Sequence, residues 1–384
     1  MRLGVYTDYS YRRAGDGIFA ERAFVLFLSE LTQHFERVVI AGRLNPESNS
    51  SQRLHYRLDD SVEFRALPHY GTLDRPAGVL RAMPATLRTF RGMLDDVDAV
   101  WLIGPHPFSL LFAAQAALRR KRIVLGIRSS FAEYVRMRHP TRRAIQLAGW
   151  ALAVSYRMLA LRVPTIVVGP RVAREYRRSR ALLEISVSLV RQEDLADPTA
   201  ALGRDYSGEL RVLSVGRMET EKNPLLVADV LARLIAEDRR WRLQMCGEGD
   251  LEAAFRDRVE ALGIAARVQM VGYTPLRGGL LDMYRDAHVL LHVSWTEGVP
   301  QVLFEAFGKG LPVVATAVGG VPGAVGDDAV LIPPGDLESA VAALRRVTSD
   351  EGLRARLVRG GLRRASERTL DREVARVAAF LREA

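Results

Sequence analysis

The sequence predicts an α/β fold in which two domains each contain a parallel sheet. The first observation is an alternation of short apolar runs, typical of buried strands, with longer stretches of helical periodicity. The second is the length of 384 residues, because single cores stop growing at about 250–300 residues. The third is a restart of the pattern near Leu210, after the polar, turn-rich segment 194–209, which we take as the linker. Alternating strands and helices imply parallel strands with helices on both faces.

The expected strands are short runs rich in Val, Ile and Leu. In the first half they cover residues 3–6, 38–41, 100–103, 123–126 and 166–168. In the second half they cover residues 212–215, 243–246, 268–271, 289–293, 313–315 and 330–332. Helices are expected between the later strands, at residues 224–237, 251–262 and 338–347.

Composition indicates a globular chain without disulfides. Hydrophobic residues make up 48% of the sequence, and the single cysteine, Cys246, lies in an apolar run. A disulfide framework and a Cys-based metal site are therefore excluded, and the cytosol is the expected compartment. The chain starts directly with a strand pattern, MRLGVYTDYS, so we expect no signal peptide.

Residues 288–310 predict a strand, a loop and a helix that together can bind an anion. The apolar run ends in turn-forming residues, and Pro300 suits the first helical position because its missing N–H would have no partner there. Gly308 and Gly310 end the helix. The unpaired N–H groups around Gly298, Val299 and Pro300, together with the helix dipole, form a site suited to phosphate.

Two glutamates, Glu297 and Glu305, lie on either side of this helix start. The neighbours of Glu305 are apolar nearly all round, so its carboxylate is expected to be buried, which is costly unless a partner satisfies it. A pair of ligand hydroxyls would be such a partner, and the two glutamates would then address two ends of a nucleotide sugar. The alternative is that Glu305 pairs with an arginine and Glu297 only caps the helix.

The surrounding motifs favour the interpretation in which Glu297 and Glu305 contact a nucleotide sugar. EGVPQVLFEA (297–306) resembles the E-x7-E motif of retaining glycosyltransferases of family 4. LRVLSVGRMETEKNP (210–224) resembles the first strand and loop of the donor-binding domain in that family. WRLQMCGEGD (241–250), VQMVGY (268–273) and LPVVATAVGGVPGAV (311–325) resemble the remaining blocks in the expected order. The resemblance is specific over about residues 205–345 and looser over the first half.

This resemblance implies the GT-B fold, in which two Rossmann-like domains with parallel sheets face each other across a cleft. Residues 1–195 would form the acceptor-binding domain and residues 205–365 the donor-binding domain. Residues 366–384 would form a helix that returns to the first domain. The implied donor is a nucleotide-diphosphate sugar, with no further cofactor and no metal.

The resemblance places Arg217 and Lys222 on the donor diphosphate, Glu305 on the ribose and Glu297 on the sugar hydroxyls. A departing diphosphate needs fixed cations, and a guanidinium fork with a lysine supplies them. Lys222 is informative because the chain has 55 Lys plus Arg but only three lysines, the others being Lys121 and Lys309. The alternative is an ordinary solvated loop charge.

The first half offers further candidates. Gly15 and Gly17 precede an expected helix, where backbone N–H groups would face the donor phosphates; a plain flexible turn is the alternative. His106 follows a buried strand, the place where open α/β sheets bind ligands, and resembles a family histidine beside the transferred sugar. Arg128 stands where many relatives have a second histidine, a departure on the acceptor side.

Positive charge is concentrated in the first half. Residues 1–200 carry 30 Lys plus Arg against 19 Asp plus Glu, and residues 119–180 carry 16 against 2. Within 142–162, residues 144–156 are uncharged, too few to span a bilayer. This segment can instead lie on an anionic membrane surface. The alternative is a buried helix beneath an arginine-rich surface.

These observations predict a retaining, metal-independent glycosyltransferase of glycan biosynthesis that moves a hexose-type sugar to a hydroxyl acceptor, either a glycan or a lipid-linked one. Its expected location is cytoplasmic, peripheral on the inner face of the membrane. A nucleotide-sugar epimerase of GT-B architecture and a non-catalytic membrane-surface binding protein are the alternatives. No motif for nucleic-acid binding accompanies the basic charge, and no G-x-G-x-x-G follows the first strand of either half, which disfavours a dehydrogenase.

Overall fold

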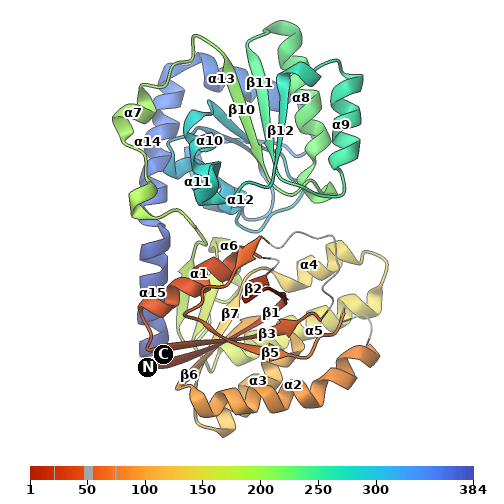
Figure 1. Ribbon diagram of the computed structural model, residues 1–384, viewed down its shortest axis with the longest axis vertical. Coiled ribbons are helices and arrows are strands. Elements are labelled where there is room, and N and C mark those ends of the chain that lie inside the picture. Colours follow the sequence, from red (N-terminus) through yellow and green to blue (C-terminus); the bar gives the residue numbers. More distant parts are fainter. Residues whose placement is uncertain (21, 47–54, 72, 74–75) are drawn as a thin grey trace. The chain divides into compact units, whose positions relative to one another are not determined.

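The computed structural model describes the whole chain except residues 21, 47–54, 72 and 74–75 (Figure 1). It divides into two compact units. Unit 1 consists of Met1–Val187 and Glu373–Ala384, and unit 2 of Ser188–Arg372. The division falls before the segment 194–209 that we took as the linker.

Unit 1 is built on a parallel sheet with an antiparallel extension. Its strands are β1 (Arg2–Ala14), β2 (Gly17–Ala20), β3 (Arg37–Leu44), β4 (Tyr56–Arg57), β5 (Glu63–Leu67), β6 (Ala99–Gly104), β7 (Arg122–Ile127), β8 (Thr165–Val168) and β9 (Leu182–Ile185). The parallel strands are arranged β5-β3-β1-β6-β7-β8-β9. β2 folds back on the end of β1, and β4 pairs with β2.

Helices cover this sheet. They are α1 (Phe24–Glu30), α2 (Pro76–Asp96), α3 (Pro107–Leu118), α4 (Phe131–Arg138), α5 (Arg143–Ala160), α6 (Pro170–Glu175) and most of α15 (Leu370–Glu383). One hydrophobic core joins α2, α3 and the inner side of α5 to strands β6 and β7. Both termini belong to this unit (Figure 1). Near the C-terminus, the Arg382 side chain donates to the backbone carbonyl of His34, and the Arg122 side chain donates to the backbone carbonyl of Arg382 at 2.6 Å.

Unit 2 holds a second, fully parallel sheet. Its strands are β10 (Leu210–Val215), β11 (Trp241–Cys246), β12 (Val268–Gly272), β13 (Val289–His292), β14 (Val313–Thr316) and β15 (Val330–Ile332). They are arranged β12-β11-β10-β13-β14-β15. The strand order therefore reverses between β10 and β13, which is the switch point of a doubly wound sheet.

The helices of unit 2 cover both faces of this sheet (Figure 1). They are α7 (Pro198–Leu202), α8 (Pro224–Glu237), α9 (Glu252–Ala261), α10 (Leu280–Asp286), α11 (Gln301–Gly308), α12 (Val321–Val325), α13 (Leu337–Ser349) and α14 (Glu351–Glu367). On one face, α8, α9 and α13 share a hydrophobic core; on the other, α10, α11 and α12 share a second.

Every strand predicted from the sequence overlaps an observed strand. The prediction missed β2, β4, β5 and β9. In β5, Glu63 and Arg65 interrupt the apolar run, and they form an ion pair with N···O 2.6 Å apart. Arg65 also pairs with Asp96 at the end of α2 at 2.8 Å. Tertiary ion pairing thus supports a strand whose composition alone does not indicate one.

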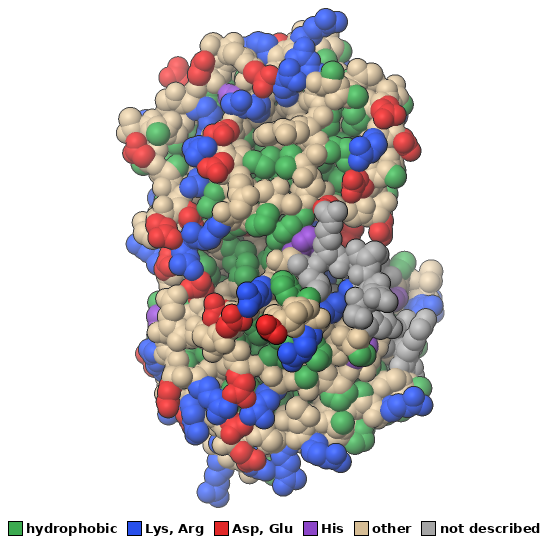
Figure 2. Space-filling view, in the orientation of Figure 1, with side chains coloured by type: hydrophobic (Ala, Val, Ile, Leu, Met, Phe, Trp, Pro, Cys, Tyr) green, Lys and Arg blue, Asp and Glu red, His purple; other side chains and the backbone are tan. Residues whose placement is uncertain are grey.

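Formal charge differs between the two halves of the chain, because residues 1–200 carry 30 Lys plus Arg against 19 Asp plus Glu. On the face of unit 2 visible in Figure 2, acidic and basic side chains are interspersed. This agrees with the 25 Lys plus Arg and 26 Asp plus Glu in residues 201–384.

Within the described ranges, no helix combines the length and the hydropathy needed to cross a bilayer.

Candidate functional site

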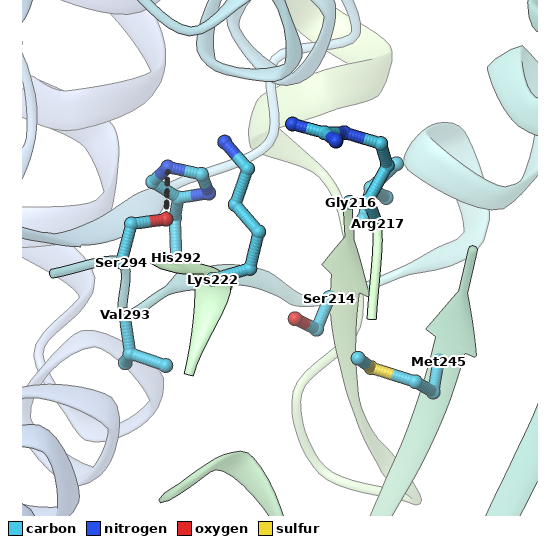
Figure 3. A pocket seen from close by; sticks show the side chains of 9 residues that line it. Ser214, Gly216, Arg217, Lys222, Met245, His292, Val293 and Ser294 are labelled. Carbon is cyan, nitrogen blue, oxygen red and sulfur yellow. Dashed lines mark hydrogen bonds between the residues drawn. The ribbon is translucent and has the colours of Figure 1, made fainter. Parts of the chain in front are cut away.

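A pocket lies at the switch point of unit 2, where the chain leaves β10 and β13 (Figure 3). It is lined by Ser214, Val215, Gly216, Arg217, Lys222, Met245, His292, Val293 and Ser294. In Figure 3 the charged ends of Lys222 and Arg217 point toward the same space. Open α/β sheets bind ligands at this position because two loops diverge there and leave a crevice.

Glu297, in the loop after β13, is the centre of a polar cluster that includes Lys222. Its Oε1 accepts hydrogen bonds from Lys222 Nζ at 2.5 Å and from Ser294 Oγ at 2.7 Å. The ring Nε2 of His292 lies 2.8 Å from the same oxygen. The structure therefore brings together two residues that the sequence analysis selected separately, 75 positions apart.

This cluster keeps Glu297 ionised. Burial alone would raise the pKa of its carboxyl, but the hydrogen bond from His292 and the charge of Lys222 outweigh burial and lower the pKa to about 2. His292 and Ser294 are themselves buried. Neither residue was predicted as part of the site, although both lie in the strand-end segment HVSWTEG that carries Glu297.

Arg217 lies at the pocket but is paired within its own loop. One guanidinium nitrogen contacts Glu219, and another lies 2.6 Å from Glu221. Its side chain is half exposed, so these pairs are weakly held and can exchange for a bound anion. Lys222 ends a 3-10 turn, Thr220–Lys222, and Asn223 after it adopts a left-handed backbone with φ 53°.

Glu305 is buried in α11, as its apolar neighbours predict. Its Oε2 accepts a hydrogen bond from the Tyr284 hydroxyl at 2.8 Å. Burial raises the pKa of Glu305 to about 7, and the Tyr284 hydrogen bond opposes that rise. Tyr284, on α10, is a further residue that sequence analysis missed, because nothing in its local sequence indicates contact with a helix 21 residues away.

The segment Gly298, Val299 and Pro300 leads into α11 with a small difference from the prediction. Pro300 is the N-cap residue, and the helix begins one residue later at Gln301. Glu297 therefore does not cap this helix. The loop that contains Glu297 packs closely against Gly319. The φ of Gly319 is 54°, and a Cβ added there would lie 1.8 Å from the Glu297 carbonyl oxygen. Only glycine allows this approach.

In unit 1, His106 follows β6 as predicted and is buried, with 3% of its surface exposed. Its Nδ1 lies 3.0 Å from the Tyr6 hydroxyl and accepts from the Phe108 N–H at 3.2 Å, which makes it the N-cap of α3. Its Nε2 lies 3.0 Å from the Tyr70 hydroxyl. Burial lowers the pKa of His106 to about 4, so the ring is neutral at pH 7.

Gly15 and Gly17 lie in a β-hairpin rather than in a loop that opens a helix. The first strand, predicted for residues 3–6, extends to Ala14, where it turns back into β2. Gly15, with φ 55°, supplies the left-handed conformation of the turn, and Gly17 pairs with Ala14. Both glycines precede a helix, as expected, but β2 lies between the turn and α1, which starts at Phe24.

Arg128, at the end of β7, forms an ion pair with Asp8 at 3.0 Å and stacks over the Tyr9 ring at 4.5 Å. All three residues lie at the same edge of the sheet as His106, the carboxyl ends of the parallel strands. Among the residues that the structure describes, no group of three or more His, Cys, Asp or Glu side chains is arranged to hold a metal ion.

Unit 2 is similar in sequence to proteins of a known family. Residues 203–364 match the family described as glycosyl transferases group 1. The D-inositol 3-phosphate glycosyltransferase of Corynebacterium diphtheriae is 34% identical over 155 residues, 37% of this chain and 35% of that protein. The putative colanic acid biosynthesis glycosyltransferase WcaL of Salmonella typhimurium is 33% identical over 144 residues, 35% of each chain. The chain spans less than half the length of the curated relatives it matches.

The solved structures extend the likeness to the whole chain. Alr3699/HepE of Anabaena, crystallised in complex with UDP, superposes with a TM-score of 0.71 over 100% of both chains at 15% sequence identity. At this identity the likeness defines the fold alone. The fold is GT-B, with a parallel α/β sheet in each unit, and the fold class predicted from the sequence is confirmed.

Proposed function

We propose that the protein is a glycosyltransferase that transfers a sugar from a nucleotide-diphosphate donor to a hydroxyl acceptor. The observation that supports this most is the pocket at the switch point of unit 2, which Arg217 and Lys222 line and beside which Glu297 pairs with Lys222. These residues lie within the segment that matches glycosyl transferases group 1. The UDP in the crystal structure of the Anabaena protein suggests a uridine nucleotide as the first donor to test.

In the proposed complex the donor diphosphate lies against Lys222, Arg217 and the backbone of Gly298, Val299 and Pro300. Lys222 and Arg217 would release their carboxylate partners and contact phosphate oxygens, which gain charge as the sugar leaves. Glu305 would accept hydrogen bonds from the ribose hydroxyls, and Glu297 from those of the sugar.

The proposed reaction retains the configuration at the anomeric carbon and needs no metal. The bond from that carbon to the diphosphate oxygen breaks, and a bond to the acceptor oxygen forms on the same face. The acceptor proton passes to the departing diphosphate. His106 and the hairpin glycines Gly15 and Gly17 remain candidates for contact with the sugar and the phosphates.

The acceptor we propose is a glycan or lipid-linked hydroxyl, and the proposed location is the cytoplasmic face of a membrane. Relatives named for colanic acid biosynthesis and for D-inositol 3-phosphate support a role in glycan or glycolipid assembly. The basic excess of residues 119–180 supports the membrane location.

A thermal-shift panel of nucleotide-diphosphate sugars tests this function. A donor at about 100 times its dissociation constant adds about 2.7 kcal/mol of stability, which is readily detected. We expect one sugar nucleotide to stabilise the protein, and Glu305→Ala to remove most of that shift. A panel with no stabilising nucleotide would refute the proposal.

An epimerase of GT-B architecture is the second candidate, since it would bind the same donors. The two are distinguished by the dependence of turnover on an acceptor. Consumption of the nucleotide sugar at the same rate with and without a hydroxyl acceptor would favour the epimerase. A non-catalytic surface-binding protein would consume none.

A further inference from the structure

Helix α5 in unit 1 is apolar on both sides, although only one side is buried. Its inner side, formed by Gly149, Ala153, Tyr156 and Ala160, packs against the core. Its outer side exposes an apolar stripe that consists of Leu147, Trp150, Ala151, Val154, Met158 and Leu161. Four of these side chains, Leu147, Trp150, Met158 and Leu161, are 65%, 56%, 54% and 46% exposed. The spacing of three or four residues places all six along one helix face.

A stripe of this kind marks an interaction surface. A surface helix normally has polar residues opposite its buried face, because apolar side chains gain nothing from exposure to water. Large contiguous apolar patches on soluble units are typical of sites that contact another molecule or a membrane. The sequence left open whether residues 144–156 pack as a buried helix, and the exposure of the stripe contradicts that alternative.

The positive charges around the stripe favour an anionic partner. Arg142 and Arg143 lie at the N-terminal end of α5 and Arg162 just beyond its C-terminal end, and all three are exposed. Residues 119–180 contain 16 basic and only two acidic residues, Glu133 and Glu175. Both acids already pair with arginines, Glu133 with Arg171 at 2.6 Å and Glu175 with Arg157 at 3.2 Å. Residues 119–180 therefore keep a large excess of positive charge.

We propose that α5 docks on the surface of an anionic lipid bilayer. The stripe enters the boundary between headgroups and acyl chains, with the helix parallel to the membrane plane. Arg142, Arg143 and Arg162 contact the phosphate groups. An apolar face flanked by cations is the pattern of helices that lie in the membrane interface, where tryptophan is also favoured. This inference deepens the membrane location under the proposed function and does not depend on the chemistry of the donor.

Trp150 provides a direct probe of docking. Of the four tryptophans, Trp101 and Trp241 are buried, and Trp295 lies in unit 2. Addition of vesicles that contain phosphatidylglycerol should shift the fluorescence of Trp150 to shorter wavelength. Vesicles of phosphatidylcholine alone should not. In Trp150→Phe the shift should disappear while co-sedimentation with the anionic vesicles persists.

Two double variants separate the contributions of the stripe and of the charges. Loss of a buried apolar side chain weakens partition by about tenfold or more, so Leu147→Ser with Met158→Ser should reduce vesicle binding at least that far. Each arginine near an anionic surface contributes about a fivefold factor, so Arg142→Gln with Arg143→Gln should weaken binding about 25-fold. The residual binding of each variant should fall further as salt is added.

Matched controls carry the same changes elsewhere. Leu80→Ser with Leu111→Ser alters exposed leucines of α2 and α3, and Arg239→Gln with Arg359→Gln removes two exposed arginines from unit 2. Both control proteins should bind vesicles as the unaltered protein does. Because the stripe lies outside unit 2, nucleotide binding and the thermal midpoint should be unchanged in all four variants, which separates failure of docking from failure of the proposed function.

Three results would overturn the proposal. The first is equal binding to anionic and zwitterionic vesicles at low salt. The second is unchanged vesicle binding in a folded stripe variant. The third is a dimer in solution that the stripe variant converts to a monomer, because the stripe would then be covered by a second copy of the chain.

Discussion

At the scale of single residues, Glu297 is the carboxylate that pairs with Lys222 beside the pocket in unit 2. Lys222, Ser294 and His292 all contact the same carboxylate oxygen, Oε1. Among the described residues, this leaves Oε2 as the oxygen that can accept from a ligand hydroxyl. Because its pKa is lowered to about 2, the carboxylate is ionised at neutral pH. The cation of Lys222 and the Oε2 of Glu297 thus suit a ligand that carries both anionic and hydroxyl groups.

We predict that Lys222→Ala slows turnover by roughly two to three orders of magnitude, the scale for one electrostatic contact to a transition state. The lysine stabilises charge that develops on the departing diphosphate, so the loss should appear mainly in kcat. Steady-state kinetics with the donor found in the thermal-shift panel would measure it. Lys121→Ala, in unit 1, removes the same group where it donates to the Val97 carbonyl, and it serves as control. Unchanged turnover in a folded Lys222→Ala protein would exclude this role.

We predict that donor affinity rises with pH through about 7. Burial raises the pKa of Glu305 to about 7, and only the ionised form offers both oxygens to the ribose hydroxyls. The hydrogen bond from Tyr284 lowers that pKa, so Tyr284→Phe should move the midpoint to higher pH. Isothermal titration with the nucleotide between pH 5.5 and 8.5 would show both effects. A flat profile in the unaltered protein would contradict the assignment of Glu305 to the ribose.

The ionisation of Glu305 should also affect folding stability. We expect stability to fall as pH rises, whereas donor affinity rises. The folded state holds its Glu305 proton up to about pH 7, whereas the unfolded state releases it near 4.5. The unfolded state therefore binds fewer protons in this window, and stability falls as pH rises from about 4.5 to about 7. The contribution of this group is about 3 kcal/mol. Glu305→Gln should remove that part of the slope in denaturant titrations.

At the scale of elements, the loop 296–298 depends on its contact with the loop that precedes α12. We predict that Gly319→Ala destabilises the protein by at least about 2 kcal/mol, because φ is 54° and the new Cβ would lie 1.8 Å from the Glu297 carbonyl oxygen. The displaced loop should also weaken donor binding. Gly208→Ala, where nothing lies within 4 Å of the added Cβ, is the matched control. Equal denaturation midpoints for the two variants would contradict the account.

Element geometry also explains the setting of His106. The ring caps α3 and lies between two tyrosine hydroxyls, so it has a structural role irrespective of any contact with a sugar. A histidine after a buried strand indicates a ligand site or a helix cap equally well, because both occur at the carboxyl ends of parallel strands. The contacts of the ring with Tyr6 and Tyr70 depend on residues 100 and 36 positions away, so only the structure could show them.

At the scale of the whole molecule, the proposed reaction makes a prediction about stereochemistry and metals. We expect the product to keep the anomeric configuration of the donor, as observed by NMR of the anomeric proton. We also expect activity to persist in EDTA, because Arg217, Lys222 and the N-terminus of α11 would already neutralise the leaving group. An inverted product, or activity lost in EDTA and restored by manganese, would contradict the retaining, metal-independent mechanism.

The sequence was sufficient for the fold class and for most of the sheet strands. Buried parallel strands are continuous apolar runs, and this pattern is local, so residues such as 212–215 and 313–315 could be identified without a structure. The hairpin at Gly15 and Gly17 could not, because the strand before it carries Arg12 and Arg13 and is defined by pairing with β2 rather than by hydrophobicity.

By itself, the sequence determined the alternating pattern of elements, the burial of Glu305 and the concentration of positive charge in residues 119–180. Each depends on neighbours along the chain. Only the tertiary structure showed that Lys222 pairs with Glu297 and that Tyr284 donates a hydrogen bond to Glu305. It also showed that the outer side of α5 is exposed. The physical reason is that partners 21 or 75 residues apart are joined by the order of strands in a sheet, and that both faces of an apolar helix look alike until one of them is packed.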